Sequence, residues 1–340
     1  MIMTKVRERL FGYDLLKALA MFMVVFYHMN MLDFAFSPES YYFPNFNKLV
    51  QILAAAGVPL FFMVNGALTV NGEMTVERLM KKIGRLVFVS VIWTILLRII
   101  VLGILMKRGA PSSLGDFLNY YWFFYSLAIV YVVNYLLSIL PKWFEYFVVT
   151  IIFAIVFLNN FVWDIILFVD PDHILPSWGH TGFYTLYGIV YTRLGAYLKK
   201  IDLKWPKCAM MIVVGYGLVC FETIIMTNSS KEIFDGVNAA FPTLGAMCLS
   251  CGIFCLLKNI KAGESWITNL VKLVGRNSGG IYVFHLVVII LLRNYVFMNL
   301  CDVAYLPVVV VVIIAAFITI VCSMASEMIR RSKCSFLLAF

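Results

Sequence analysis

Residues 11–29, FGYDLLKALAMFMVVFYHM, form an apolar run long enough to cross a bilayer as one helix. Three ionisable side chains interrupt it: Asp14, Lys17 and His28. Ionisable groups at bilayer depth are costly and by default serve a function. Because eleven steps of about 100° nearly complete whole turns, Lys17 and His28 share one face, with Asp14 within roughly 60° of it. The run therefore predicts an acid, a cation and an imidazole along one stripe of the first membrane helix.

The composition of the whole chain also indicates a membrane protein. Of its 340 residues, 63% are hydrophobic and 13% are charged, and the mean hydropathy is +0.93. Soluble domains carry about 25% charged residues. The net charge of +9 therefore indicates lysines and arginines that hold loops in the cytoplasm, not affinity for nucleic acid. The basic start resembles a signal peptide, but the long, charge-bearing run lacks a small-x-small cleavage site, which predicts a retained helix.

Ten apolar segments have the length that a bilayer-spanning helix needs, about 17 to 25 residues. They are 10–32, 49–70, 84–106, 119–140, 143–161, 180–198, 207–227, 238–257, 278–299 and 304–328. The fifth and sixth are the least defined, because Asn159, Asn160 and Asp164 interrupt the fifth near its end. We expect an all-α, polytopic membrane protein with about ten transmembrane helices. The short linkers predict a single membrane domain over residues 1–340 with no appended soluble domain.

Basic residues alternate between loops as the positive-inside rule requires. Nineteen lysines and arginines fall at the termini and after the second, fourth, sixth and eighth segments, against four in the other loops. Both termini are therefore predicted to be cytoplasmic. Residues 263–274, GESWITNLVKLV, are typical of an amphipathic helix on the inner membrane surface. No internal repeat is visible, which removes the simplest argument for a transporter.

The loop after the second segment continues into ERLMKKIGRL, which is rich in basic residues. Arg78, Lys82 and Arg85 follow the spacing i, i+4, i+7 and so share one side of a helix. Either they only fix the orientation of the chain, or they form an anion clamp for the phosphates of a nucleotide-bearing ligand. No P-loop and no G-x-G-x-x-G after a strand is present, so ATP hydrolysis and dinucleotide chemistry have no support.

Four other ionisable residues lie inside the predicted spans. For His285, in NSGGIYVFHL, a satisfied buried histidine is the simpler interpretation. Arg98 is deep in the third segment and favours a structural ion pair and a substrate contact equally. Glu222 and Arg293 lie near segment ends, where snorkelling to the interface explains them. Each of these residues alone is therefore a weak sign of a functional site.

The outer loops and the cysteines give weaker signals. Loops 33–48 and 159–180 combine aromatic side chains with carboxylates, which is typical of an interfacial aromatic belt and also of a carbohydrate site. His173 and His180 lie among aspartates, a weak metal pattern on which we place no prediction. All eight cysteines follow residue 207, and the one C-x-x-C lies inside a predicted span, which favours helix packing over a metal site.

Taken in order along the chain, the motifs resemble the membrane acyltransferase-3 superfamily over nearly the whole sequence. They are the acid, base and histidine of the first helix at Asp14, Lys17 and His28; an aromatic patch at Phe61, Phe62, Asn65 and Gly66; an R-x-x-R-like pair at Lys82 and Arg85; a Trp-Phe start at Trp122 and Phe123; LGAYL around Gly195; and S-x-x-I-Y-x-x-H at Ser278, Ile281, Tyr282 and His285. Lysine stands for arginine at positions 17 and 82, and asparagine for serine at position 65. Lysine does not match arginine in bidentate phosphate contacts. The resemblance therefore implies the class of acyl donor, acyl-CoA, more firmly than the affinity with which it binds.

The resemblance implies an O-acyltransferase that moves an acyl group from cytoplasmic acyl-CoA, its co-substrate, to a hydroxyl of an envelope glycan or lipid-linked sugar. The donor phosphates are expected at Arg78, Lys82 and Arg85. The pantetheine arm is expected to pass Lys17, because the rise from there to His28 is about 16 Å, close to the reach of that arm.

His28 is the expected general base for the attacking hydroxyl. Asp14 and Lys17 would steer the donor or set the local potential. Tyr282 and His285 would line the donor channel, or His285 would protonate the leaving thiolate. Depth estimates put His285 nearer the cytoplasm than His28, so the two histidines are not expected to form one dyad.

Several points stay open at the level of sequence. Asn65, Arg98 and Trp122 are expected at the acceptor or along the channel. Acetyl is the first choice of acyl group and succinyl the second, whose carboxylate Arg98 would meet. Direct transfer is favoured over an acyl-serine, with an acyl-histidine still open. No metal and no permanently bound cofactor is expected, the predicted location is the bacterial plasma membrane, and the oligomeric state is undefined.

Two other functions are compatible with the sequence. A proton-coupled transporter of a sugar-linked or acidic solute would use Asp14, Lys17 and His28 as a proton relay. A sensory or scaffold protein would carry these buried charges incidentally.

Overall fold

A computed structural model describes residues 10–31, 46–70, 74–105, 121–173, 185–230, 236–237, 240–296 and 307–338. Within these ranges the chain is helical and has no β-strand. The helices are α1 (Phe11–Met31), α2 (Phe46–Ile52), η2 (Leu53–Ala56), α3 (Gly57–Thr69), α4 (Val76–Leu105), α6 (Trp122–Ser138), α7 (Lys142–Phe153), η4 (Ala154–Leu158), α8 (Asn159–Val169), α9 (Leu186–Leu198), α10 (Trp205–Ser230), α11 (Leu244–Leu257), α12 (Trp266–Arg276), α13 (Ser278–Tyr295), α15 (Val308–Arg331) and η5 (Ser335–Leu337).

Helices occupy all ten predicted positions. Within the described residues, six stretches are long and apolar enough to cross a membrane: Phe11–Met29, Lys48–Thr69, Val76–Ile100, Lys142–Val169, Trp205–Thr227 and Val308–Arg331. α6 and α11 are shorter apolar helices, and α12 and α13 form a pair bent by 83°. The chain is therefore an all-α integral membrane protein. The full number of ten spans and the cytoplasmic side of the termini stay predictions.

The predicted end of the fifth segment at residue 161 is wrong. α7 continues through η4, a π-helical turn, into α8, so that one apolar stretch runs to Val169. Asn160 and Asp164 do not end the helix, because they are buried against neighbouring helices. The Asn160 amide donates to the carbonyl of Pro242 at 3.2 Å. A π-turn shifts the helix register, and such turns are common at functional sites. Of the predicted outer loop 159–180, residues 174–180 lie outside the described residues.

Glycines allow two pairs of helices to pack backbone against backbone. A Cβ at Gly66 of α3 would overlap the backbone of Thr192 of α9, and a Cβ at Gly195 would overlap that of Met63. α10 and α11 are packed through glycines in the same way. Small residues are the usual contact in membranes, where close van der Waals packing drives helix association. Cys251 of α11 is buried in this core, which agrees with a packing role.

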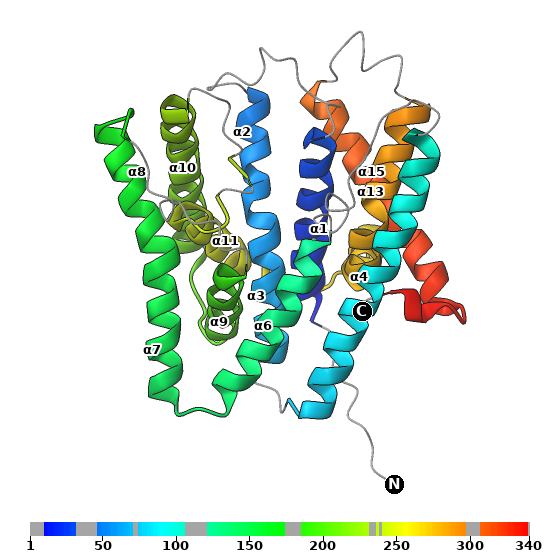
Figure 1. The fold of residues 1–340 in the computed structure, drawn as a ribbon, viewed down its shortest axis with the longest axis horizontal. Coiled ribbons are helices and arrows are strands. Elements are labelled where there is room, and N and C mark those ends of the chain that lie inside the picture. The colour runs from blue at the N-terminus through cyan, green and yellow to red at the C-terminus, as the bar shows by residue number, and fades with distance from the viewer. Residues whose placement is uncertain are drawn as a thin grey trace.

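Several helices bring basic residues to one end of the bundle, which we call the basic end (Lys199, Lys258 and the start of α4). Lys199 donates to the carbonyl of Ala67 in α3 at 2.8 Å, and Lys258 to that of Leu198 in α9 at 2.6 Å. A Cβ at Gly12 would overlap the backbone of Lys258, so α1 also begins here. Cations at helix C-termini satisfy the last carbonyls and the helix dipole. In Figure 1, α4 and α7 both start at the bottom of the view.

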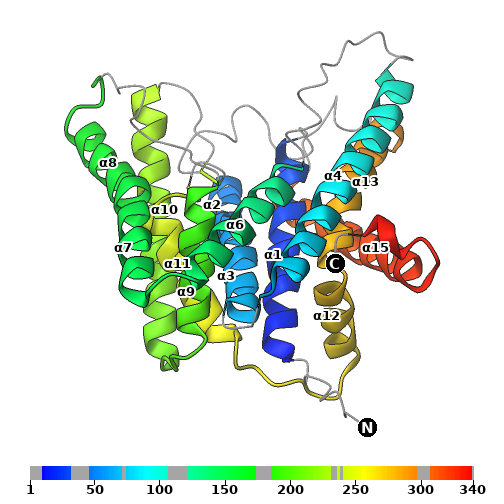
Figure 2. The ribbon, with the colours of Figure 1, turned by 60° about the horizontal axis from the view of Figure 1, so that its bottom comes forward.

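α12 is the short helix predicted at residues 263–274, and its bounds are Trp266–Arg276. Ser265 caps its start, because its hydroxyl accepts the backbone N–H of Thr268 at 3.1 Å. A Cβ at Gly275 would overlap the backbone of Asp14, so the end of α12 lies against α1. Figure 2 shows α12 beside the lower part of α1. The placement of this helix on a membrane surface stays a prediction.

Candidate active site

A cavity of about 440 Å³ lies among α1, α3, α4, α6, α12 and α13, close to the basic end. In Figure 1, α6 slants from the level of the middle of α1 down towards the start of α7. The helices that carry the predicted motifs therefore meet around one space.

The cavity has a strongly positive wall. Five cationic side chains line it: Lys17, Lys81, Lys82, Arg85 and Arg276. None of its described lining residues is acidic. A concave surface of one sign of charge concentrates ligands of the opposite sign. Lysine and arginine are also the side chains that bind phosphate groups. The cavity is therefore suited to a ligand with several negative charges, such as the phosphates of a nucleotide.

The other part of the wall is aromatic. Phe61, Phe123, Phe124 and Tyr282 line it. The ring of Tyr282 lies 4.8 Å from that of Phe124 and 5.5 Å from that of Phe123, measured between centroids. An apolar wall suits the uncharged arm of a long ligand, because the arm leaves water without losing charge–water contacts. Cationic and aromatic walls in one cavity thus match a molecule with a charged head and a less polar tail.

Asn65, which the sequence predicts at the acceptor or along the channel, lies in the cavity wall. Its side-chain oxygen accepts a hydrogen bond from the hydroxyl of Tyr131 at 2.8 Å. The ammonium of Lys82 lies 4.9 Å from the centroid of the Tyr131 ring, which is a cation–π contact. Tyr131 therefore holds a cation with its ring and an amide with its hydroxyl, and fixes both in the wall.

The side of α4 that faces the cavity differs by one residue from the predicted clamp. Lys82 and Arg85 line the cavity, but the exposed Arg78 does not. Although Arg78 is on the same face, it lies about 6 Å nearer the start of the helix than Lys82, beyond the cavity. Lys81 lines the cavity instead, with its ammonium 2.7 Å from the carboxylate of Glu77.

Arg85 is held by a distant part of the chain. Its Nε donates to the carbonyl of Leu338 at 2.8 Å and its Nη2 to that of Ser335 at 3.2 Å. Trp93, two turns further along α4, donates to the carbonyl of Leu337 at 2.9 Å. The turn after α15 thus folds back on α4 and orients the guanidinium. Arg85 cannot offer its whole fork to a ligand, because two of its nitrogens already donate to carbonyls.

The two histidines of the predicted motifs lie together, which corrects the expectation that they do not pair. Nε2 of His285 is 3.4 Å from Nδ1 of His28, and the ring centroids are 4.9 Å apart. The depth estimate failed because it placed the start of α13 at the membrane surface. Ser278 and Gly279, the first residues of α13, line the cavity inside the bundle, so His285 reaches the level of His28.

The hydrogen bonds of both rings assign their tautomers. Nδ1 of His28 is 2.8 Å from the carbonyl of Val24, and Nδ1 of His285 is 3.1 Å from that of Ile281. Since a carbonyl only accepts, these contacts assign the hydrogen of each neutral ring to Nδ1. The basic lone pair of His28 is then on Nε2. This is the tautomer in which Nε2 can take a proton from a hydroxyl.

Tyr282 connects the cavity with the histidine pair. It lines the cavity, and its ring centroid lies 5.6 Å from that of His285. His28 and His285 are not among the lining residues. Tyr282 therefore lies between the cavity and the pair, because it lines the cavity and precedes His285 by one helical turn on α13.

The structure separates the remaining predicted residues. Lys17 lines the cavity, while Asp14 is buried where α1 meets α12. Arg98 is half-buried on α4 and Trp122 packs on Phe123, and neither lines the cavity. Asp14, Lys17 and His28 thus lie on the same helix, but of these three only Lys17 lines the cavity.

Two cavity cations, Lys81 and Arg276, were not among the predicted site residues. Lys81 neighbours the predicted Lys82, and only the rotation of α4 decides that both face the cavity. Arg276 is the last residue of α12, next to the S-x-x-I-Y-x-x-H element. Its position depends on the 83° bend between α12 and α13, which no local pattern specifies. The Gly-rich segment after it is the one sequence signal of a break.

The fold is that of an integral membrane protein, and its cavity has a cationic wall and an aromatic wall, with a histidine pair next to the aromatic wall. The model of the acyltransferase-3 family, described as an acyltransferase domain, matches residues 10–328. The chain therefore belongs to this family of membrane acyltransferases. No curated protein and no solved structure matches it.

Proposed function

We propose that this protein is an O-acyltransferase of the bacterial plasma membrane that moves an acyl group from cytoplasmic acyl-CoA to a hydroxyl of an envelope glycan or lipid-linked sugar. Acetyl is the first choice of acyl group and succinyl the second. The observation that carries the proposal is the cavity: five cations line it, and Tyr282 in its aromatic wall lies one helical turn from a histidine pair. The basic end then faces the cytoplasm, where acyl-CoA is found.

In this proposal the phosphates of coenzyme A lie against Lys81, Lys82, Arg85 and Arg276. The pantetheine arm extends along the aromatic wall past Lys17, whose distance from His28 along the helix is about 16 Å. The ring of Tyr282 moves aside so that the thioester reaches the imidazole. No cofactor is retained after turnover, because coenzyme A leaves as product.

The chemical step needs one base and one acid. His28 Nε2 takes the proton of the acceptor hydroxyl while the oxygen attacks the thioester carbonyl. The C–O bond forms and the C–S bond breaks, and the imidazolium of His28 then returns the same proton to the leaving thiolate of coenzyme A, so that His28 acts first as base and then as acid. His285 holds the His28 ring in place through its contact with Nδ1. Placing the reacting groups in one enclosed site lowers the entropic part of the barrier.

Proteoliposomes with purified protein test the proposal. We expect radiolabelled acetyl-CoA to release coenzyme A in step with label appearing in an extracted envelope glycan fraction. His28→Ala should lower this rate by roughly 10² to 10⁴, the usual contribution of a general base. His173→Ala is the matched control, since His173 is exposed and pairs with Asp170 at 3.3 Å, away from the cavity.

Two results would contradict the proposal. A folded His28→Ala protein with full transfer activity would remove the imidazole from the mechanism. Accumulation of a solute in the vesicles without consumption of thioester would favour the transporter. Succinyl-CoA in parallel with acetyl-CoA decides the acyl group.

A further inference from the structure

We propose that Glu327 of α15 is a positioning residue for the donor site, acting through Arg276. This inference rests on the proposed function, because it assigns a role in binding the donor phosphates. Glu327 does not line the cavity, whereas Arg276 does. A carboxylate behind the guanidinium can hold the cation in the wall without placing negative charge where phosphates bind.

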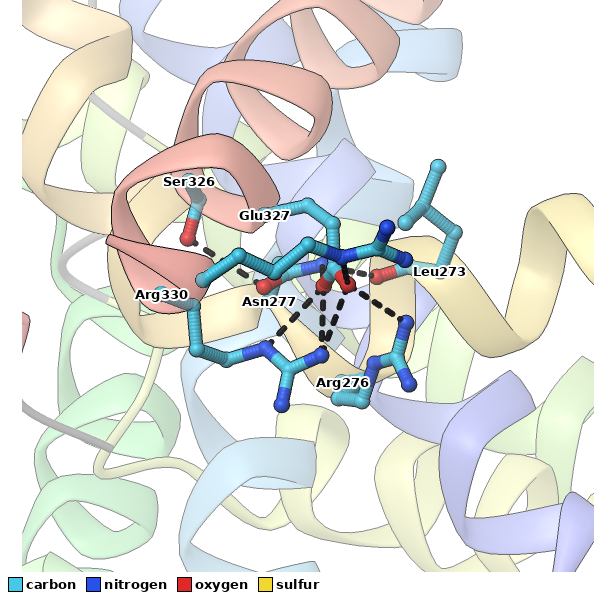
Figure 3. Close-up of polar contacts among 7 residues, drawn as sticks. Leu273, Arg276, Asn277, Ser326, Glu327 and Arg330 are labelled. Atoms are coloured by element: carbon cyan, nitrogen blue, oxygen red, sulfur yellow. Dashed lines mark hydrogen bonds and ion pairs between the residues drawn. The ribbon is translucent and has the colours of Figure 1, made fainter. Parts of the chain in front are cut away.

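The carboxylate of Glu327 is the centre of a dense polar cluster (Figure 3). One oxygen is 3.1 Å from Nη2 of Arg276 and 2.8 Å from Nε of Arg331. Arg330 reaches both oxygens, at 2.7 and 2.8 Å, through Nη2. The Asn277 amide donates to Glu327 at 3.0 Å. The side chain of Glu327 is 9% exposed, so these partners replace its water.

The same cluster fixes the corner between α12 and α13. Asn277 is the one residue between the two helices, and its amide also donates to the carbonyl of Leu273 at 2.9 Å. The hydroxyl of Ser326 donates to the side-chain oxygen of Asn277 at 3.3 Å. A Cβ at Gly280 would overlap Ser326, so α13 lies directly on α15 here. These contacts hold α12 and α13 in a fixed relative orientation, and in this orientation Arg276 lines the cavity.

The charge of the cluster supports a role in anion binding rather than in stability alone. Three guanidinium groups surround one carboxylate, which leaves an excess of two positive charges. One arginine would be enough to satisfy a buried carboxylate, and further cations repel each other. The excess is relieved when an anion binds beside Arg276. Arg276 is the one member of the cluster that lines the cavity within the described chain.

Binding of coenzyme A to the detergent-purified protein, measured by calorimetry, tests the proposal without turnover. Glu327→Asp keeps the charge but withdraws the carboxylate, and we expect about a tenfold weaker Kd. Arg276→Gln should weaken binding about as much. Since Glu327 acts through Arg276, the double variant should bind no more weakly than Arg276→Gln alone.

The matched control is Glu77→Gln. Glu77 also pairs with a cavity cation, Lys81, but both side chains are about three-quarters exposed, so we expect an unchanged Kd. Thermal unfolding of each variant separates loss of fold from loss of binding. If Glu327→Asp does not fold, Arg276→Gln still tests the proposal, because that side chain is 38% exposed and its replacement leaves the carboxylate two arginines.

An unchanged or tighter Kd in folded Glu327→Asp would overturn the proposal, as would an unchanged Kd in Arg276→Gln. Additive losses in the double variant would also overturn it, because they mean that Glu327 acts on the fold as a whole. Failure of the proposed function has a different signature. In that case the unmodified protein itself neither binds coenzyme A nor transfers an acyl group.

Discussion

Asn65 is a neutral residue of the cationic wall at which one added negative charge should weaken donor binding. It lines the cationic cavity and accepts a hydrogen bond from Tyr131. Asn65→Asp keeps the shape and this hydrogen bond but places a carboxylate among the cations. We expect the KM for acyl-CoA to rise about tenfold with kcat nearly unchanged. The new carboxylate repels the donor phosphates equally in the bound complex and in the transition state, so it weakens binding without slowing the chemical step.

Steady-state kinetics at several acyl-CoA concentrations measure this effect. Asn65→Ser is the matched control, since it keeps a neutral hydrogen-bonding group and should leave KM within a few-fold. An unchanged KM for Asn65→Asp would show that the donor phosphates bind elsewhere.

At the scale of single residues, motif matching found the side chains whose neighbours are local in sequence. Lys17, Lys82 and Tyr282 were predicted from patterns within one helix, and all three line the cavity. Arg276 was missed because its place depends on a carboxylate about fifty residues later in the chain. The contact between His28 and His285 was missed for a similar reason, because helix length measured from a supposed membrane surface does not give the level at which α13 starts.

At the scale of helices, the α3–α9 contact is a sharp test of the packing. α3 carries four of the cavity-lining side chains, Asn65 among them, and Gly195 brings α9 into backbone contact with it at Met63. Gly195→Ala would put a Cβ into that backbone. We expect a loss of about 1–3 kcal/mol or more in stability, typical of overpacking, and a lower Tm in detergent. Thermal unfolding followed by intrinsic fluorescence measures it.

Gly217→Ala on α10 is the control for this substitution. A Cβ there meets nothing within 4 Å, so the change should be neutral or raise stability by up to about 1 kcal/mol through helix propensity. Equal Tm values for the two variants would mean that α3 and α9 are not in backbone contact.

The sequence predicted the elements better than their ends. Apolar length located a helix at every expected position, because burial in lipid demands a continuous apolar run. It misplaced the end of the fifth segment, because Asn160 and Asp164 look like a loop until the helices that bury them are known. The break before α13 was not predicted, because its angle is set by Asn277 and α15 and is therefore a tertiary property.

For the whole molecule, the decisive property is which side of the membrane the basic end faces. The distribution of lysines and arginines predicts the cytoplasm. Cys334, in the turn after α15, is exposed, whereas the other cysteines of the described chain are buried or half-buried. Arg85 lines the cavity and donates to the carbonyl of Ser335 in the same turn. The accessibility of the Cys334 thiol therefore shows on which side of the membrane this part of the cavity lies.

We expect a membrane-impermeant maleimide to label Cys334 in inverted vesicles and not in right-side-out ones. Cys334→Ser should abolish that label and so identify the site. Labelling of right-side-out vesicles at this residue would place the cationic cavity on the outer side. Cytoplasmic acyl-CoA would then have no access to the cavity. Both the assignment of the five cavity cations to phosphate binding and the proposed direction of transfer would be wrong.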